Sequence, residues 1–243
     1  IMSDLLLLDR TDDITTITIN DADNGNRVSD DMAVQLTNML NKAQQDSHSI
    51  IFKSTGDDFC QGRAIMGEES KNLPEALEMR GKFDVVFDLY DAFRNSVVPI
   101  VGVVQGEAHG FGAALAALTD ITICSDQAKF SLPETSHNIM PTMAMSALMG
   151  RVSRKALMYM TYTCDVIDAD TALSFGLASQ VVPHDELDVT VEACIVKLNR
   201  IPRSAIKAVK EFSTEAEELT TKSAKAYARN LHATINSSET LRK

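Results

Sequence analysis

Residues 100–104, Ile-Val-Gly-Val-Val, are apolar at every position. A strand without a polar face has to be covered on both sides, which is typical of the centre of a parallel sheet. Three glycines follow within residues 106–112, and the next residues, 113–118, are small, apolar and suited to a helix. These features predict a buried central strand, a tight turn and a helix that packs closely against its neighbours.

The rest of the first half alternates strand-like and helix-like segments. Ser29 has the features of a helix N-cap, because two aspartates follow it in the first turn and apolar residues then recur at helical spacing. We expect strands at 5–8, 14–19, 50–52 and 121–124, and a long helix at residues 76–95 whose candidate core positions are Phe83, Val86, Phe87, Tyr90 and Phe93. Strands that alternate with helices predict parallel βαβ units and an α/β fold.

Helix-like segments dominate after residue 143. The only strand-like piece expected there is Val181-Val182. The helices are expected at residues 143–150, 153–162, 168–175, 185–200 and 203–235. The pattern therefore predicts an α/β core followed by a helical region.

Charge and cysteine usage narrow the possible partners. The net charge of −11 disfavours nucleic acid as a partner, because phosphate binding needs clustered Lys and Arg. The four cysteines contain no CxxC pair, which disfavours a metal site or a disulfide framework and favours a cytoplasmic location. The apolar run at residues 5–8 is too short for a signal peptide or a membrane span. We therefore expect neither a nucleic-acid nor a membrane partner.

Three loops follow predicted strands, at residues 58–65, 105–114 and 128–138. Ligands bind beyond the carboxyl ends of the strands in parallel sheets. Two glycines at the helix start in the second loop leave unpaired N–H groups that suit an oxyanion. Close helix packing explains the same glycines equally well, and an ordinary strand-to-helix loop explains the first segment.

Glu134 is the candidate acid or base in the third loop. It lies in a mostly apolar stretch, which would raise its pKa toward that of a working general base. The alternative is a solvated surface charge. His137 follows three residues later and points either into the same pocket or into solvent.

Five segments together resemble the successive signatures of the crotonase (enoyl-CoA hydratase/isomerase) superfamily. Each segment is weak alone, but their order and spacing match over residues 5–215. The segments are Asn26 followed by Val28-Ser29, Phe59-Cys60-x-Gly62, the Gly106-to-Gly112 run closing on Asp120-Ile121, Ala128-x-Phe130-x-x-Pro133-Glu134, and Ala172-x-x-Phe175-Gly176-Leu177-Ala178-x-x-Val181-Val182.

The resemblance implies a spiral core of ββα units at residues 1–185 and a C-terminal helical region at 186–243 for trimerisation. It further implies self-association to a trimer, or to a hexamer made of two trimers. The substrate would be an acyl-CoA whose thioester carbonyl binds the backbone N–H groups of Arg63 and Phe111. Coenzyme A would enter as part of the substrate, with no permanently bound cofactor and no metal.

Further site residues follow from the same resemblance. Glu134 matches the glutamate that moves a proton, and the remaining positions would contact the substrate or its CoA part. These positions are Asn26, Arg27, Gln61, Gly62, Ala64, Ile65, Gly110, Pro133 and His137.

One departure from the family pattern bears on the reaction. The second glutamate of typical hydratases falls at Ala114, and alanine cannot move a proton. Isomerisation or hydration of an enoyl-CoA with Glu134 as the single acid/base is the leading prediction. Decarboxylation, C–C hydrolysis, lyase chemistry and non-catalytic binding of acyl-CoA or of a protein partner stay open, as do the acyl group and its carrier.

Overall fold

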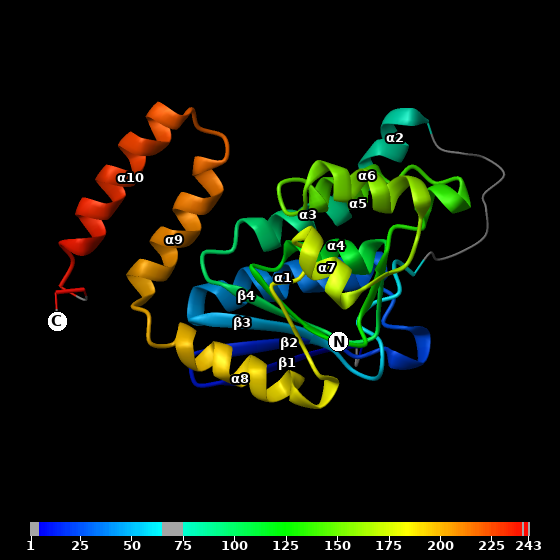
Figure 1. The fold of residues 1–243 in the computed structure, drawn as a ribbon, viewed down its shortest axis with the longest axis horizontal. Helices are drawn as coiled ribbons and strands as arrows, with labels where there is room; N and C mark the ends of the chain where they lie inside the picture. The colour runs from blue at the N-terminus through cyan, green and yellow to red at the C-terminus, as the bar shows by residue number, and fades with distance from the viewer. Residues whose placement is uncertain (1–4, 65–74, 240, 243) are drawn as a thin grey trace.

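The computed structural model describes residues 5–64, 75–239 and 241–242. Its main sheet has six strands in the order β1-β2-β3-β4-β6-β9 (Figure 1). Among the described strands of this sheet, only β1 and β2 pair antiparallel, and every other neighbouring pair is parallel, as predicted. The strands are β1 (Leu6–Thr11), β2 (Ile14–Ile19), β3 (Ser49–Ser54), β4 (Ile100–Val104), β6 (Ile121–Ser125) and β9 (Gln180–Val182).

Helices cover both faces of this sheet. Helix α1 (Asp30–Asp46) packs on α3 (Asp84–Arg94) over one face, and α8 (Leu187–Leu198) contacts β4 and β6 on the other. All five residues of β4 are buried, which confirms the predicted central strand. The Ser29 side chain accepts a hydrogen bond from the backbone N–H of Met32, which confirms the predicted N-cap.

A second sheet was missing from the sequence-based expectation. It has three short strands in the order β5-β7-β8, namely β5 (Glu107–His109), β7 (Lys129–Ser131) and β8 (Ile167–Asp168). The expected turn at residues 106–112 therefore contains a strand, and Val181-Val182 is not the only strand after residue 143. Strands of two or three residues carry no readable periodicity, and pairing with distant segments forms them.

Two expected long helices are each divided. Residues 76–95 form α2 (Ala76–Gly81) and the separate α3, and Gly81 at the end of α2 is a poor helix former. Residues 203–235 form α9 (Arg203–Ala216) and α10 (Thr221–Asn236). Thr220 starts α10 as an N-cap, because its side chain accepts a hydrogen bond from the N–H of Ser223. The helical spacing of apolar residues continues across both breaks, so the sequence pattern did not predict them.

The last two helices form a hairpin, called the arm here, that stands beside the body of the fold (Figure 1). Lys210 on α9 ties the arm to the body through a 2.7 Å ion pair between its Nζ and Asp120 Oδ1. Asp120 Oδ2 also accepts a 2.8 Å hydrogen bond from the N–H of Ile100 in β4. The remaining helices are α4 (Phe111–Leu118), α5 (Thr142–Leu148), α6 (Arg154–Thr163), α7 (Ala169–Phe175), and the 3-10 turns η1 (Ala22–Asn24), η2 (Glu134–His137) and η3 (His184–Glu186).

None of the helices in the described ranges is long and apolar enough to cross a bilayer. Even α1 and α10, the two longest, fall short of the roughly 20 apolar residues that a span requires.

Candidate active site

The first two predicted loops pack directly on each other. The N–H groups of Phe59 and Cys60 both donate to the carbonyl of Glu107, over 3.1 and 3.0 Å, and the N–H of His109 donates to the carbonyl of Cys60 over 3.0 Å. Gly112 at the start of α4 touches the same carbonyl, because a Cβ atom at position 112 would lie 1.9 Å from the Cys60 oxygen. No side chain larger than hydrogen fits there, so this contact requires glycine.

The amide of Arg63 is free of backbone pairing on the side of its partner strand. Val28 and Arg63 form a parallel bridge in which Val28 donates to the carbonyl of Gly62 and accepts from the N–H of Ala64, over 3.1 and 3.0 Å. In a parallel bridge of this kind the N–H of Arg63 points away from Val28. Within the described part of the chain, no backbone carbonyl accepts a hydrogen bond from this amide.

The amide of Phe111 is the first of α4, and the first four N–H groups of a helix lack an intrahelical acceptor. It also has no backbone acceptor among the described residues. The helix dipole adds partial positive charge at this end. Through the contact between Gly112 and Cys60, the two predicted oxyanion donors therefore lie on neighbouring segments.

Glu134 completes the arrangement at the start of η2. A Cβ atom on Gly110 would lie 2.8 Å from Glu134 Oε1, so the carboxylate rests against the residue that precedes Phe111. Burial raises the pKa of Glu134, and its own backbone amide and the nearby His137 oppose that rise in part. Its Oε2 is buried and finds no hydrogen-bond partner among the described residues. Glu134 is therefore half-buried and is not a fully solvated surface charge.

Tyr90 is a site neighbour that the sequence indicated only as a core position. It lies on α3, is 0% exposed, and its ring stacks on the ring of Phe111 with centroids 5.8 Å apart. Its hydroxyl is buried without a hydrogen-bond partner in the described ranges. The sequence signal for this neighbour was a tyrosine among the apolar residues on one face of the predicted helix. A buried Tyr hydroxyl usually has a hydrogen-bond partner, so such a position is a candidate for a polar contact.

The predicted CoA-binding residues of the first loops hold one another in place. The side-chain amide of Asn26 donates to the carbonyls of Thr55 and Asp58, over 2.8 Å in each case. Arg27 donates to the side-chain oxygen of Gln61 over 2.9 Å. Asn26 is buried and its side chain shapes the loop, whereas the exposed guanidinium of Arg27 lies at the surface. Contact of these residues with CoA stays a prediction.

The other predicted positions lie around the same loops. The Arg63 side chain pairs with Asp30, so only the backbone of Arg63 is available for the predicted oxyanion hole. His137 is exposed, and Ile65 lies outside the described residues. Gly62 has a φ of +123°. Gly110 also has a positive φ, of +52°. Ala64 and Pro133 are half-buried.

Glu134 is the one carboxyl group among the predicted site residues that the structure describes. Ala114, which stands at the position of the second glutamate of typical hydratases, is 0% exposed within α4. Burial raises the pKa of the neighbouring Cys60 to about 12, so this thiol is not a nucleophile at neutral pH. No group of three or more His, Cys, Asp or Glu side chains in the described ranges is placed to hold a metal ion. The local chemistry is therefore backbone donors plus one carboxyl group of raised pKa.

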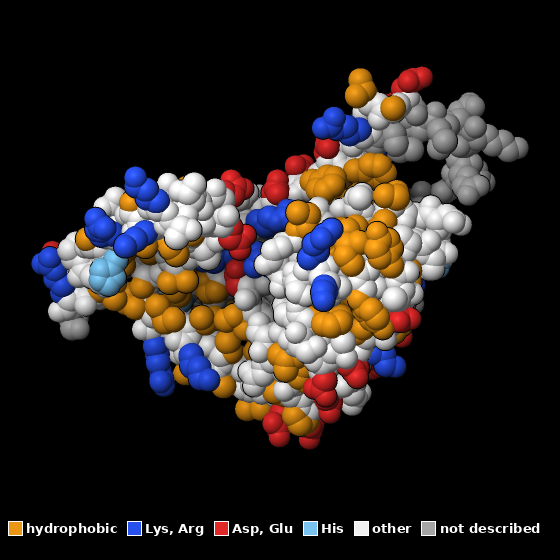
Figure 2. Space-filling view, turned by 45° about the horizontal axis from the view of Figure 1, so that its top comes forward, with side chains coloured by type: hydrophobic (Ala, Val, Ile, Leu, Met, Phe, Trp, Pro, Cys, Tyr) orange, Lys and Arg blue, Asp and Glu red, His pale blue; other side chains and the backbone are white. Residues whose placement is uncertain are grey.

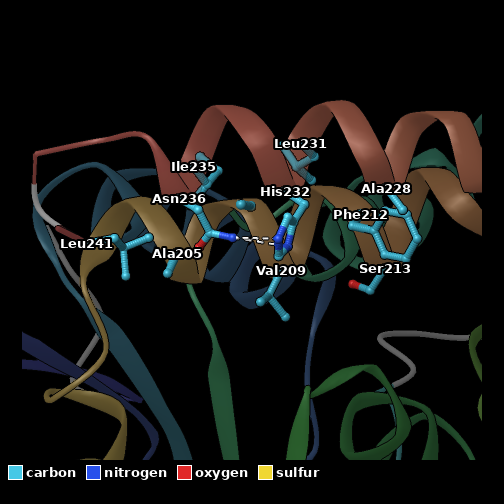
Figure 3. Close-up of a pocket in the computed structure, with 11 residues that line it drawn as sticks. Ala205, Val209, Phe212, Ser213, Ala228, Leu231, His232, Ile235, Asn236 and Leu241 are labelled. Carbon is cyan, nitrogen blue, oxygen red and sulfur yellow. Dashed lines mark hydrogen bonds between the residues drawn. The ribbon is translucent and has the colours of Figure 1, made fainter.

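A hollow lies far along the chain from these loops, between the two helices of the arm. Figure 3 shows its lining side chains projecting from α9 and α10. Its polar groups include His232 and Asn236, which are joined by a hydrogen bond. The apolar lining residues are Ala205, Ala208, Val209, Phe212, Ala228, Leu231, Ile235 and Leu241. Because its lining is mostly apolar, this hollow is suited to packing against another surface.

Comparisons with known proteins identify the family of this chain. A family model described as Enoyl-CoA hydratase/isomerase matches residues 9–243. The mouse protein named enoyl-CoA hydratase domain-containing protein 3, mitochondrial, is 28% identical over 177 residues, covering 70% of this chain and 56% of the mouse protein. The chain thus spans just over half the length of this relative and of its rat counterpart.

Two mycobacterial proteins match over most of their length. The protein named probable enoyl-CoA hydratase echA8 of Mycobacterium bovis is 28% identical over 229 residues, covering 93% of this chain and 87% of that protein. A solved structure of an enoyl-CoA hydratase from Mycobacterium smegmatis superposes with a TM-score of 0.91 at 26% identity, covering 98% of this chain and 93% of the other.

Proposed function

Because this chain belongs to the enoyl-CoA hydratase/isomerase family, we propose that it is an enzyme that stabilises the enolate of an acyl-CoA thioester. The amides of Arg63 and Phe111 bind the thioester oxygen, and Glu134 moves the proton. The observation that carries this proposal is the packing of the three loops. Gly112 rests on the Cys60 carbonyl, and Gly110 rests on the Glu134 carboxylate.

The mechanism needs one base and two fixed donors. The ionised Glu134 takes a proton from the carbon next to the thioester carbonyl, and the electron pair moves onto the carbonyl oxygen as an enolate. Preorganised N–H groups stabilise this developing charge, each by roughly 3–4 kcal/mol. Protonated Glu134 then returns the proton to a carbon further along the chain, which shifts the double bond. Coenzyme A enters only as part of the substrate.

Isomerisation is favoured within this proposal because a single carboxyl group is sufficient for it. Hydration has to add a water molecule, and the buried Ala114 supplies no second carboxylate to orient it. Hydration therefore relies on Glu134 alone or on a polar group from another part of the pocket.

We expect turnover of unsaturated acyl-CoAs in deuterated water to reveal the reaction by mass. Hydration of a 2-enoyl-CoA adds one D2O to the product mass, whereas isomerisation of a 3-enoyl-CoA adds no oxygen and moves the double bond next to the thioester, which fragmentation of the product locates. Deuterium enters the isomerised product only where the proton on Glu134 exchanges with solvent before it is returned. The control is the same incubation with Glu134→Gln protein, which lacks the base. If wild-type protein binds acyl-CoAs but converts none of a panel of chain lengths, the binding-only alternative replaces the enzymatic proposal.

Self-association to a trimer, or to a hexamer of two trimers, is the second part of the proposal. None of the described α10 side chains is buried, and Val209 on α9 is 68% exposed. Figure 2 shows a run of hydrophobic side chains over the arm. Exposed apolar patches of this kind mark protein interfaces.

A cytoplasmic location also remains our proposal, supported by four unpaired cysteines.

Sedimentation velocity tests the trimer directly. The mass of the wild-type species in sedimentation should be three or six times the 26.5 kDa of one chain. Val209→Lys places a charge on the apolar arm and should release smaller species, because a buried unpaired charge is costly. The matched control is Val189→Lys on α8, since Val189 is also exposed, at 59%. Wild-type protein that sediments as one chain at micromolar concentration contradicts this proposal.

A further inference from the structure

Tyr90 carries a polar group that the fold buries and does not use. The side chain is 0% exposed, and its hydroxyl has no hydrogen-bond partner within residues 5–64, 75–239 and 241–242. Most buried polar groups in proteins are hydrogen-bonded, because an unpaired one loses its bonds to water without replacement. A phenylalanine would fill the same space without this cost, so the hydroxyl needs another explanation.

The ring of Tyr90 belongs to the candidate active site. It stacks on Phe111, whose amide is a predicted oxyanion donor, with centroids 5.8 Å apart and planes inclined by 24°. The guanidinium carbon of Arg94 lies 5.9 Å from the centroid of the same ring. These contacts and the complete burial of the side chain fix the ring, so the direction of its hydroxyl is set by packing.

The charges around Tyr90 come from the same site. Burial raises the pKa of its hydroxyl most, and the Glu134 carboxylate adds to the rise. The guanidinium groups of Arg63 and Arg94 oppose it. The group therefore remains a protonated O–H donor across the physiological range. Its electrostatic neighbours include Glu134 and Arg63, two of the predicted catalytic positions.

The two unpartnered polar atoms of this region have different chemistry. Among described side chains with a buried and unpaired polar atom, Glu134 contributes Oε2 and Tyr90 its hydroxyl. A carboxylate that transfers protons needs an oxygen free for the substrate. A neutral phenol in the same neighbourhood is suited to donating a hydrogen bond to an oxygen of the substrate.

We propose that Tyr90 is a specificity-determining residue whose hydroxyl donates a hydrogen bond to an oxygen atom on the acyl chain of the substrate. The thioester oxygen itself is assigned to the backbone amides, so the Tyr90 partner is a second oxygen. The preferred substrates are therefore acyl-CoAs whose acyl group carries a hydroxyl, oxo or carboxylate oxygen. This inference rests on the proposed function, because it takes acyl-CoA as the ligand.

Tyr90→Phe tests the inference, because it removes the hydroxyl and keeps the stacking ring. Calorimetric titration would compare unsubstituted acyl-CoAs with acyl-CoAs of equal length that carry one oxygen at successive carbons. Wild-type protein should bind at least one oxygenated ligand about 10-fold or more tighter than its unsubstituted match. Tyr90→Phe should lose about 10- to 100-fold in that affinity and change the unsubstituted affinity by less than about 2-fold. Tyr162→Phe is the control, since that side chain is 75% exposed.

Several results would overturn the inference. An equal loss for both kinds of ligand indicates a water molecule or a packing role as the partner, and no loss for either indicates no ligand contact. A ligand-free melting temperature that falls by several degrees in Tyr90→Phe indicates a structural hydrogen bond, whereas removal of an unpaired buried hydroxyl should leave it unchanged or raise it. If wild-type protein binds no acyl-CoA, the proposed function is contradicted as well. If wild-type protein binds and converts unsubstituted acyl-CoAs and Tyr90→Phe leaves every affinity unchanged, only this inference is contradicted.

Discussion

Glu134→Gln is expected to lower turnover of acyl-CoA by about 10³-fold, within the 10²- to 10⁴-fold range of general acid–base catalysis. The glutamine keeps the shape of the side chain beside Gly110 but cannot accept a proton. Affinity for CoA should stay within about 2-fold of wild type, because neutral and ionised side chains of the same shape leave the backbone donors in place. Assays of acyl-CoA conversion measure turnover, and calorimetric titration with CoA measures affinity.

The same substitution should stabilise the protein at neutral pH. Burial raises the pKa of Glu134 in the folded state above its unfolded value, so folding favours the protonated form. Its contribution to stability is full below the unfolded pKa of about 4.3 and is lost as pH rises through the folded pKa. Melting temperatures of Glu134→Gln should therefore exceed those of wild type at pH 7 and converge with them near pH 4.

Catalysis has the opposite dependence on pH, because the base has to be ionised. The rate of proton abstraction by wild-type protein should rise with pH through the raised pKa of Glu134 and then level off. Glu186→Gln is the matched control, since Glu186 is exposed in η3. A Glu134→Gln variant with wild-type turnover would remove the single base from the mechanism and leave the binding-only alternative.

Gly112→Ala is expected to damage both the fold and the reaction. The added methyl carbon would lie 1.9 Å from the Cys60 carbonyl oxygen, so the backbone of the first loop or of α4 has to move. Overpacking against backbone should cost about 3 kcal/mol, which lowers the melting temperature by roughly 6–12 °C for a chain of this size. Differential scanning calorimetry measures this loss.

The loss of activity in Gly112→Ala has a separate cause. Moving the Cys60 segment shifts the amide of Arg63 relative to that of Phe111, and loss of one oxyanion donor costs about 10²- to 10³-fold in turnover. Assays well below the melting temperature of the variant separate this effect from unfolding. Gly81→Ala is the control, because the nearest atom to a Cβ there is Asp84 Oδ2 at 3.9 Å. A Gly112→Ala variant with wild-type stability and activity would refute the packing of the two loops.

Much of the fold could be predicted because its signals are local. The two-sided apolarity of residues 100–104, the cap at Ser29 and the alternation of strands and helices all survive in the structure. The predicted crotonase fold is confirmed by the family match and by the TM-score of 0.91 with the M. smegmatis hydratase. The elements that were mispredicted, such as β5 and the divided helix at 76–95, depend on distant pairing or on a break within an unbroken apolar pattern.

The candidate site divides in the same way. The sequence predicted Glu134 and the glycines at 110 and 112, because a tight turn favours glycine and an acid in an apolar stretch can be recognised locally. That Gly112 meets the carbonyl of Cys60, and Gly110 the carboxylate of Glu134, was decided only by tertiary structure. The same holds for Tyr90, which the sequence predicted only as a core residue. Tertiary packing places its ring against Phe111 and leaves its hydroxyl without a hydrogen-bond partner among the described residues. Residue types and short-range spacing set which chemistry is available, whereas the meeting of loops some 20 to 50 residues apart depends on the sheet and helices that carry them.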